Sequence, residues 1–311
     1  VTWAEIPFVG PGGYADTGFV GKENLKENAR QQLNELIRQQ YNHPGICVWG
    51  LFNELKAEGD DPTDFVKELN DLAHSLDPYR PTTAASFQYG VPLNEVTDEI
   101  GFNRYDGWYG STPKTLATFL DDYHAEHPDA RLSISEYGAG ASIYHQQDTL
   151  KQPVAASYWH PENWQTYYHM ENWKIINERP FLWGTFIWAM FDFAAANRTE
   201  GDRPGINDKG IVTRDRKVCK DAYYFYQANW SEKPMVYIEG RRNTLRLHPE
   251  TEVMVFSNAS SVTLSLNGKT VGTMSPDEYH ICRFPVTLEK GKNVINAVAD
   301  GLEDRCEWTL Q

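Results

Sequence analysis

The chain has 311 residues, and its 29 Lys and Arg stand against 43 Asp and Glu, so that the net charge is −14. No stretch approaches the roughly 18–20 consecutive apolar residues of a membrane-spanning helix, so we expect no membrane span. The excess of acid leaves no broad basic surface for a phosphate backbone, which argues against a nucleic-acid partner.

Apolar runs that resemble buried strands alternate with helical patterns over the first part of the chain. The runs end near Glu5, at Glu54, at Ser86, at Tyr105, at Glu136 and near Asp192. The helical patterns cover residues 22–40, 62–77 and 112–127. Alternation of apolar strands with amphipathic helices predicts an α/β fold with a parallel sheet covered by helices.

A (β/α)8 TIM barrel is the form of this sheet that we predict for residues 1–230. Six strands are visible, whereas such a barrel needs eight in roughly 250 residues. The chain opens on VTWAEIPF, which has no initiator Met and no leader features and reads as the interior of a strand. We therefore expect the first barrel strands to lie upstream, in a longer natural protein.

The tail, residues 231–311, has a different pattern. Short alternating runs such as EVMVFSN and SVTLSLNG are separated by turn sequences, which predicts a small antiparallel sandwich. We place the boundary at Ser231–Pro234. The four cysteines are far apart and contain no CxxC pair, so they are buried thiols or a disulfide rather than a zinc ribbon.

Two acids stand at the carboxyl ends of predicted strands, Glu54 and Glu136. In a barrel these ends share one rim, where active sites are built. A pair of carboxyls, one protonated and one ionised, is what cleavage of a glycosidic bond needs. The structural alternative for either Glu alone is that it caps the following helix or pairs with Arg or Lys.

Polar and aromatic residues near these acids suit a carbohydrate. Asn53 offers an amide next to Glu54. Tyr105 and Trp108 follow the strand that precedes the one ending at Glu136, and Trp188 lies within the last predicted strand. Sugar rings present C–H faces that stack on aromatic rings. The alternative is that these aromatic residues fill the layer between strands and helices.

The motifs around both acids resemble glycoside hydrolase family 2. YNHPGICVWGLFNE is similar to the acid/base segment of that family and LSISEYGAGAS to its nucleophile segment. FNRYDGWYG, WAMFDF and NDKGIVTRDRK are similar to its later barrel segments. The resemblance covers residues 1 to about 230, and the tail is similar to the Ig-like sandwiches that follow the barrel in many members.

The resemblance implies a role for each residue at a matching position. Glu54 would be the general acid/base and Glu136 the nucleophile of a retaining double displacement, with their carboxyls roughly 5–5.5 Å apart. Asn53 would hold the sugar 2-hydroxyl, Tyr105 would bond the nucleophile, and Trp188 would wall the sugar site. It also implies a sugar-binding-like sandwich, an Ig-like domain and the first two barrel strands ahead of this chain.

The sugar is the open point within that family. The sequence as a whole is most similar to β-galactosidases with extra C-terminal sandwiches, so a retaining exo-β-galactosidase is our leading expectation. The alternative is a β-glucuronidase, because Asn207 and Lys209 fit the Asn-x-Lys pattern that grips a sugar carboxylate there. An ammonium and an amide suit such an anion, although Lys209 would equally pair with a local acid in a turn.

We expect neither a metal nor a cofactor. Metal-binding members of the family carry Glu and His shortly after the third strand, where this chain has PFVGPGG, residues 7–13. The expected partner is a carbohydrate substrate, and a homo-oligomer is compatible with the sequence. An extracytoplasmic location is suggested only by the usual location of polysaccharide-degrading relatives.

A different class of protein also fits the aromatic rim, namely a carbohydrate-binding protein without catalytic activity. Two facing carboxyls argue against it, because a binding module has no need of them. The two classes differ in how they respond to Glu136→Gln: an enzyme loses turnover, whereas a binding protein changes little.

Overall fold

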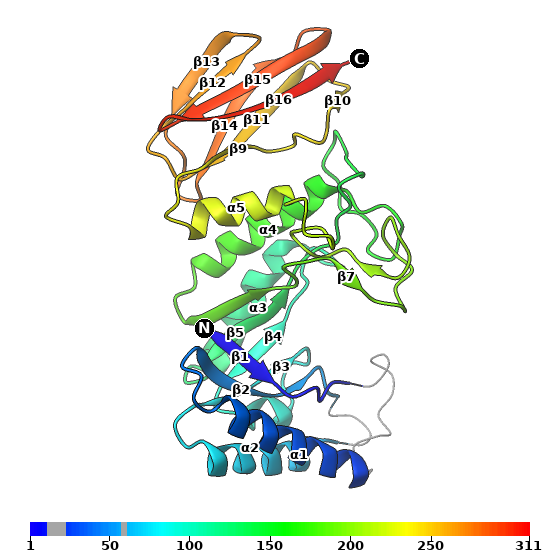
Figure 1. The fold of residues 1–311 in the computed structure, drawn as a ribbon, viewed down its shortest axis with the longest axis vertical. Helices are drawn as coiled ribbons and strands as arrows, with labels where there is room; N and C mark the ends of the chain where they lie inside the picture. Colours follow the sequence, from blue (N-terminus) through cyan, green and yellow to red (C-terminus); the bar gives the residue numbers. More distant parts are fainter. Residues whose placement is uncertain (11–22, 57–60) are drawn as a thin grey trace. The chain divides into compact units, whose positions relative to one another are not determined.

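The computed structural model describes residues 1–10, 23–56 and 61–311 (Figure 1). These form two compact units. Unit 1 comprises Val1–Tyr105, Leu116–Tyr137 and Glu178–Ile187, and unit 2 comprises Asp106–Thr115, Gly138–Asn177 and Trp188–Gln311.

Unit 1 is built on a six-stranded sheet in the order β1-β2-β3-β4-β5-β6. All five neighbouring pairs are parallel, which confirms the predicted parallel sheet. The strands are β1 (Thr2–Glu5), β2 (Ile46–Asn53), β3 (Thr82–Ser86), β4 (Ile100–Asn103), β5 (Leu132–Tyr137) and β6 (Leu182–Ile187). Trp3 of β1 stacks on Trp183 of β6 with ring centroids 6.2 Å apart, so aromatic side chains of the two outer strands meet.

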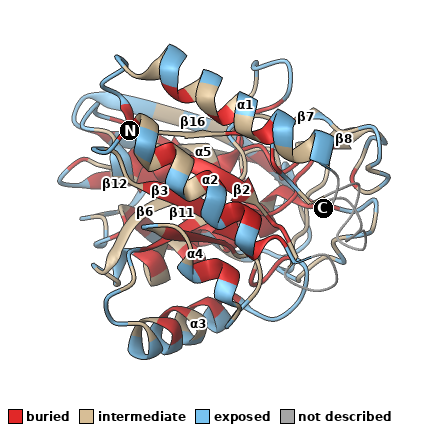
Figure 2. Ribbon diagram, turned by 90° about the horizontal axis from the view of Figure 1, so that it is seen from below, coloured by how far each residue is buried: buried red, intermediate tan, exposed pale blue. Residues whose placement is uncertain are grey.

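Helices cover the sheet, as their periodicity predicts. They are α1 (Glu23–Gln40), α2 (Thr63–Leu76), α3 (Pro113–Glu126) and the short 3-10 helix η1 (Pro92–Glu95). Ala29, Leu33 and Ile37 are the buried residues of α1, at the four-residue spacing that places side chains on one face. Figure 2 shows the opposite faces of α1 and α2 exposed and β2 buried.

Unit 2 contains two helices that the sequence analysis did not identify, α4 (Glu162–Asn177) and α5 (Asp221–Trp230). α4 buries polar as well as apolar side chains, among them Glu162, Gln165 and His169, so it lacks the apolar stripe that marks a surface helix. α5 runs beside α4 (Figure 1). Phe225 of α5 meets Phe256 of the sandwich edge-on at 5.6 Å.

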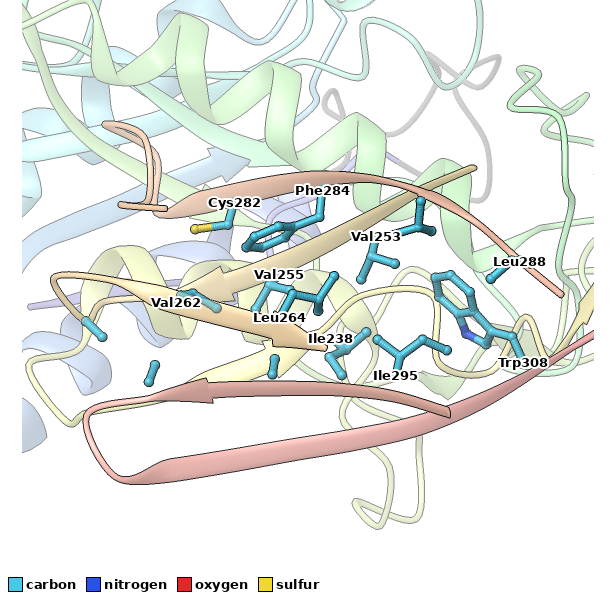
Figure 3. Packing of buried hydrophobic residues seen from close by; sticks show 14 of the residues in the cluster. Ile238, Val253, Val255, Val262, Leu264, Cys282, Phe284, Leu288, Ile295 and Trp308 are labelled. Atoms are coloured by element: carbon cyan, nitrogen blue, oxygen red, sulfur yellow. The ribbon is translucent and has the colours of Figure 1, made fainter. Parts of the chain in front are cut away.

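The tail forms a two-sheet sandwich, as predicted. One sheet has the order β10-β16-β15-β12-β13 and the other β14-β11-β9. The strands are β9 (Val236–Ile238), β10 (Leu245–Arg246), β11 (Glu250–Ser257), β12 (Val262–Leu266), β13 (Lys269–Met274), β14 (Ile281–Thr287), β15 (Gly291–Ala299) and β16 (Leu302–Leu310). Figure 3 shows side chains of both sheets, such as Val253, Phe284 and Ile295, filling the space between them.

Two local details of the sandwich concern a turn and a strand pairing. β12 and β13 are joined through Asn267 and Gly268, both at positive φ (52° and 79°). A two-residue hairpin turn of this kind needs such angles, and Asn-Gly adopts them readily. The pairing of β10 with β16 is parallel, an exception to the antiparallel pattern that we predicted.

The predicted boundary at Ser231–Pro234 falls between α5 and β9, but unit 2 spans it, so the division into 1–230 and 231–311 stays a prediction.

All four cysteines are free thiols, which makes the disulfide alternative wrong. Cys47 is exposed, so the thiols are not all buried either. Within the described ranges, no helix combines the length and apolarity needed to cross a bilayer.

Candidate active site

The carboxyl ends of three strands of unit 1 carry polar side chains. Asn53 is the last residue of β2 and Glu54 follows it, while β4 ends in Asn103 and Glu136 lies near the end of β5. Asn103 pairs directly with Glu136 in the sheet register. Since the strands are parallel, all these residues lie at one edge of the sheet, which is the edge that carries active sites in barrels.

Glu54 is buried in an unusual backbone conformation. Its side chain and backbone together are only 8% exposed, and its φ is 53°. Positive φ costs a non-glycine residue free energy, and such strain is concentrated at functional sites. The backbone N–H of Glu54 donates to Ala85 O (2.8 Å), and Gly10 approaches so closely that a Cβ there would lie 2.8 Å from Glu54 O.

The strain at Glu54 predicts a difference between two variants that both lack the carboxyl. Glu54→Gly should be more stable than Glu54→Ala by about 1 kcal/mol, because glycine tolerates this φ. Chemical unfolding of the two full-length variants measures the difference. Equal stability, or a more stable alanine variant, would contradict a strained backbone at this position.

Asn103 connects the two acidic positions, and the sequence analysis did not single it out. Its Nδ2 donates to Glu54 Oε1 (2.8 Å) and to Asn53 Oδ1 (3.0 Å). Its Oδ1 accepts a bond from Ser135 Oγ (2.7 Å), next to Glu136. The available signal was a polar residue that ends an apolar strand, the same signal that marked both glutamates.

Glu136 has a phenol as its direct partner. Tyr105 Oη donates to Glu136 Oε2 (2.5 Å), and the Arg104 N–H donates to the backbone oxygen of Glu136 (2.7 Å). The pairing of Tyr105 with Glu136 is the one that the family resemblance implies. The bond fixes the position of one carboxylate oxygen of Glu136.

Glu5 is a third acid of unit 1 to which the sequence analysis assigned no role. Burial raises its pKa to about 8, the bond from the Trp3 indole (2.9 Å) acts to lower it, and the charge of Glu136 adds to the rise. Glu5 is therefore mainly protonated near neutral pH. Glu136 thus has a neutral carboxyl, rather than a second anion, in its electrostatic neighbourhood.

Unit 2 carries the remaining predicted site residues. Lys209 is 2% exposed, and its Nζ lies 5.0 Å from the ring centroid of Tyr109 and 5.8 Å from that of Trp108. Trp108 is also 2% exposed. Asn207 ends the short strand β8 (Ile206–Asn207), which pairs with β7 (Phe193–Ala194), and its Oδ1 accepts a bond from the Lys209 N–H (3.2 Å).

Asp208 is the acid next to Lys209 in the sequence. Its Oδ2 lies 2.7 Å from His160 Nδ1. Burial acts to raise the pKa of Asp208, but the bond with His160 and the charges of His160, Lys220 and Lys209 lower it below its ordinary value. Asp208 is therefore ionised at neutral pH, and its carboxylate is engaged by His160.

Trp188 lies beyond the end of β6, not within the last strand as predicted, because the chain leaves the sheet at this point. The carbonyl oxygen of Trp188 packs so closely on Gly138 that a Cβ there would lie 2.0 Å from it. The next residue, Ala189, donates its N–H to Lys209 O (3.2 Å). The ring of Trp188 meets Phe193 edge-on at 5.6 Å.

The predicted residues thus lie in two groups, one in each unit. In unit 1 hydrogen bonds join Glu54 to Asn53 through Asn103, and separately join Glu136 to Tyr105. In unit 2 Lys209 contacts Asn207 and Trp108, and the residue after Trp188, Ala189, donates its N–H to the Lys209 backbone oxygen.

The metal prediction concerns residues 7–13, of which 11–13 lie outside the described residues. Across the described ranges, no three His, Cys, Asp or Glu side chains gather in a way that could hold a metal ion. The expectation of no catalytic metal stays a prediction.

Comparison with known proteins gives a consistent result. The family model described as "Glycosyl hydrolases family 2, TIM barrel domain" matches residues 18–233, which include five strands of the parallel sheet, so the sheet is TIM-barrel-like. A second model, for a domain of unknown function, matches residues 249–303 within the sandwich.

Individual relatives carry two different names. A β-glucuronidase of Bacteroides fragilis is 64% identical over 303 residues, which is 97% of this chain and 44% of that protein. A β-galactosidase of Thermoanaerobacter pseudethanolicus is 44% identical over 279 residues, 86% of this chain and 33% of that protein. The crystal structure of an FMN-binding β-glucuronidase of Faecalibacterium prausnitzii has a TM-score of 0.90 at 38% identity, covering 99% of this chain and 47% of that one. The chain thus spans less than half the length of these relatives.

Proposed function

The chain belongs to glycoside hydrolase family 2, and on this basis we propose that it is part of a retaining exo-β-glucuronidase. Such an enzyme removes a terminal β-linked glucuronic acid with net retention at the anomeric carbon. The proposal replaces β-galactosidase as the leading reading, because the relative with 64% identity is named a β-glucuronidase.

The observation that carries the choice of sugar is the environment of Lys209. A buried ammonium against the faces of two aromatic rings, on a residue whose backbone N–H donates to the Asn207 amide oxygen, suits a ligand that combines an anion with a sugar ring. Asp208, the acid beside Lys209, is bonded to His160. A carboxylate at C6 of the sugar would complement the ammonium and the amide, whereas a galactose hydroxymethyl group has no charge to offer.

The proposed reaction has two displacements at the anomeric carbon. First, a carboxylate oxygen of Glu136 bonds to this carbon while the glycosidic C–O bond breaks, and Glu54 gives its proton to the leaving oxygen. Then Glu54 takes a proton from water, whose oxygen bonds to the anomeric carbon as the bond to Glu136 breaks. Proton and charge are restored at the end of the cycle.

The hydrogen bonds of unit 1 support a role for specific atoms in this cycle. Asn103 donates to Glu54 Oε1, so that oxygen is an acceptor and the acidic proton belongs on Oε2. Tyr105 donates to Glu136 Oε2, which stabilises the carboxylate when it departs in the second step. Asn53, held by Asn103, would meet the 2-hydroxyl of the sugar.

Asn103 is therefore expected to matter for the rate although it has no proposed contact with the sugar. Asn103→Ala should lower kcat by roughly 100-fold, because misplacing a reacting group by about 1 Å has this effect. Ser135→Ala, which removes only the bond to Asn103 Oδ1, is the matched control and should lower kcat much less. A wild-type kcat for Asn103→Ala would show that this side chain does not position Glu54.

The direct test of the function is hydrolysis of aryl β-glucuronide, β-galactoside and β-glucoside by the full-length protein. Preference for the glucuronide by orders of magnitude in kcat/KM is expected. Preference for the galactoside would favour the second candidate, a β-galactosidase, which the relative from Thermoanaerobacter pseudethanolicus supports. Binding without turnover of any sugar would favour a carbohydrate-binding protein.

A homo-oligomeric state stays a prediction.

A further inference from the structure

Lys220 is a fully buried ammonium at the residue before α5. Its Nζ donates to the backbone oxygens of Ala141 (2.7 Å) and Asp208 (2.9 Å). Its third bond goes to Asp192 Oδ1 (2.9 Å). An ammonium has three donors, so all of them are used inside the protein and none remains for a substrate.

The bond to Asp208 O matters because of the peptide group to which this oxygen belongs. The Asp208–Lys209 peptide is held at its carbonyl by Lys220 Nζ and by the Ala141 N–H (3.0 Å). It is held at its N–H by Asn207 Oδ1 (3.2 Å). A peptide group is planar, so bonds at both of its ends fix its orientation and the direction in which Lys209 leaves the backbone.

The same bonds orient the amide of Asn207. Its oxygen accepts the Lys209 N–H, so the donor end of the amide, the Nδ2 group, is the end left to meet a ligand. A carboxylate accepts bonds from both an amide NH2 and an ammonium. The fixed peptide therefore constrains the backbone that carries two donors suited to one anion.

The side chain of Asp208 is confined on its other side. Asp208 Oδ2 lies against His160 Nδ1, and the His160 ring meets Trp108 edge-on at 4.8 Å. Gly140 leaves the room that this needs, since a Cβ there would lie 2.6 Å from Asp208 Oδ1 and 2.9 Å from the Trp108 ring. The carboxylate of Asp208 is thus held beside His160.

We propose that Lys220 is a positioning residue for the recognition of the sugar carboxylate. By holding the Asp208–Lys209 peptide, it sets the direction of Lys209 and Asn207 and so determines selectivity for uronic over neutral sugars. This inference rests on the proposed function. It differs from a general structural role in that loss of Lys220 should affect binding of the charged sugar selectively.

The test replaces the ammonium without leaving a buried carboxylate alone, through Lys220→Met combined with Asp192→Asn in the full-length protein. Steady-state kinetics are measured with an aryl β-glucuronide and an aryl β-galactoside. We expect KM for the glucuronide to rise by about 30-fold with kcat within about threefold of wild type, and kcat/KM for the galactoside to change by less than about threefold.

Two matched controls accompany this variant. Asp192→Asn alone keeps the amine and its bonds to both backbone oxygens, and should leave KM for the glucuronide within about threefold of wild type. Lys217→Met removes an exposed lysine near the same helix and should have no effect. If the Met variant does not fold, Lys220→Gln with Asp192→Asn keeps a donor group and should show a smaller rise in the same KM.

The outcomes separate this inference from the function on which it rests. Wild-type enzyme without a preference for the glucuronide would overturn both. Wild-type preference that persists in the Lys220 variants would overturn the role of Lys220 alone. An equal loss of kcat/KM on both substrates would also overturn it, because that pattern indicates a structural contribution without selectivity.

Discussion

Glu136→Gln is expected to abolish turnover of every aryl β-glycoside that the full-length protein cleaves. The amide keeps the shape of the carboxyl but cannot form the glycosyl ester, so kcat should fall by roughly 10⁵-fold or more. Sugar affinity, measured by calorimetry with the unreactive product sugar, should change little. Full retention of turnover would exclude Glu136 as the nucleophile.

Glu54→Gln separates the two carboxyls by their roles. A general acid contributes most when the leaving group is poor, so this variant should lose roughly 10²–10⁴-fold on alkyl or phenyl glycosides. It should lose far less in the first step with a dinitrophenyl glycoside, whose phenolate departs without a proton. If the two variants have the same dependence on the leaving group, the assignment of acid and nucleophile is wrong.

Lys209→Met is expected to have a large effect that is restricted to the charged sugar. In the proposed complex the Lys209 ammonium and the sugar carboxylate form a buried charge pair with hydrogen bonds, and removal of one partner of such a pair weakens binding strongly. We therefore expect kcat/KM for an aryl β-glucuronide to fall by roughly 10²–10³-fold. For an aryl β-galactoside the same variant should change little, because Met keeps an unbranched apolar stem of similar size near Trp108 and Tyr109.

Asn207→Ala is the partner measurement for the same clamp. It removes a neutral donor, and it also frees the Lys209 N–H that the Asn207 oxygen holds. We expect a smaller but selective loss on the glucuronide. Equal losses on charged and neutral glycosides for both variants would show that these residues support the fold rather than recognise a carboxylate, and β-galactosidase would return as the better reading.

Local patterns in the sequence predicted the strands β1–β6 and the helices α1–α3, but not η1, and they extended the last strand beyond its end at Ile187. The apolar runs ending at Glu54 and Glu136 are β2 and β5 of the sheet, and the amphipathic pattern over residues 22–40 is α1. These patterns are local because strand alternation and helical periodicity repeat within a few residues. For the same reason they placed both acids at strand ends, where parallel pairing brings them to one edge.

Other features depended on contacts between residues distant in the sequence. α4 escaped detection because it buries polar side chains such as His169, whose environment comes from elsewhere in the chain. Trp188 was placed in a strand because its sequence is apolar, but pairing of Ala189 with Lys209 takes the backbone out of the sheet. No local pattern records such a pairing.

The sequence thus predicted the fold class, a candidate pair of carboxyls and two candidate sugars. Of these it favoured galactose, whereas the relative with 64% identity is named a β-glucuronidase. Only the tertiary structure identified Asn103 as the link between Glu54 and Asn53, and Lys220 as the support of the Asp208–Lys209 peptide. The physical reason is that a side-chain hydrogen bond needs correct distance and direction. Residues far apart in the chain acquire these only when the fold brings them together.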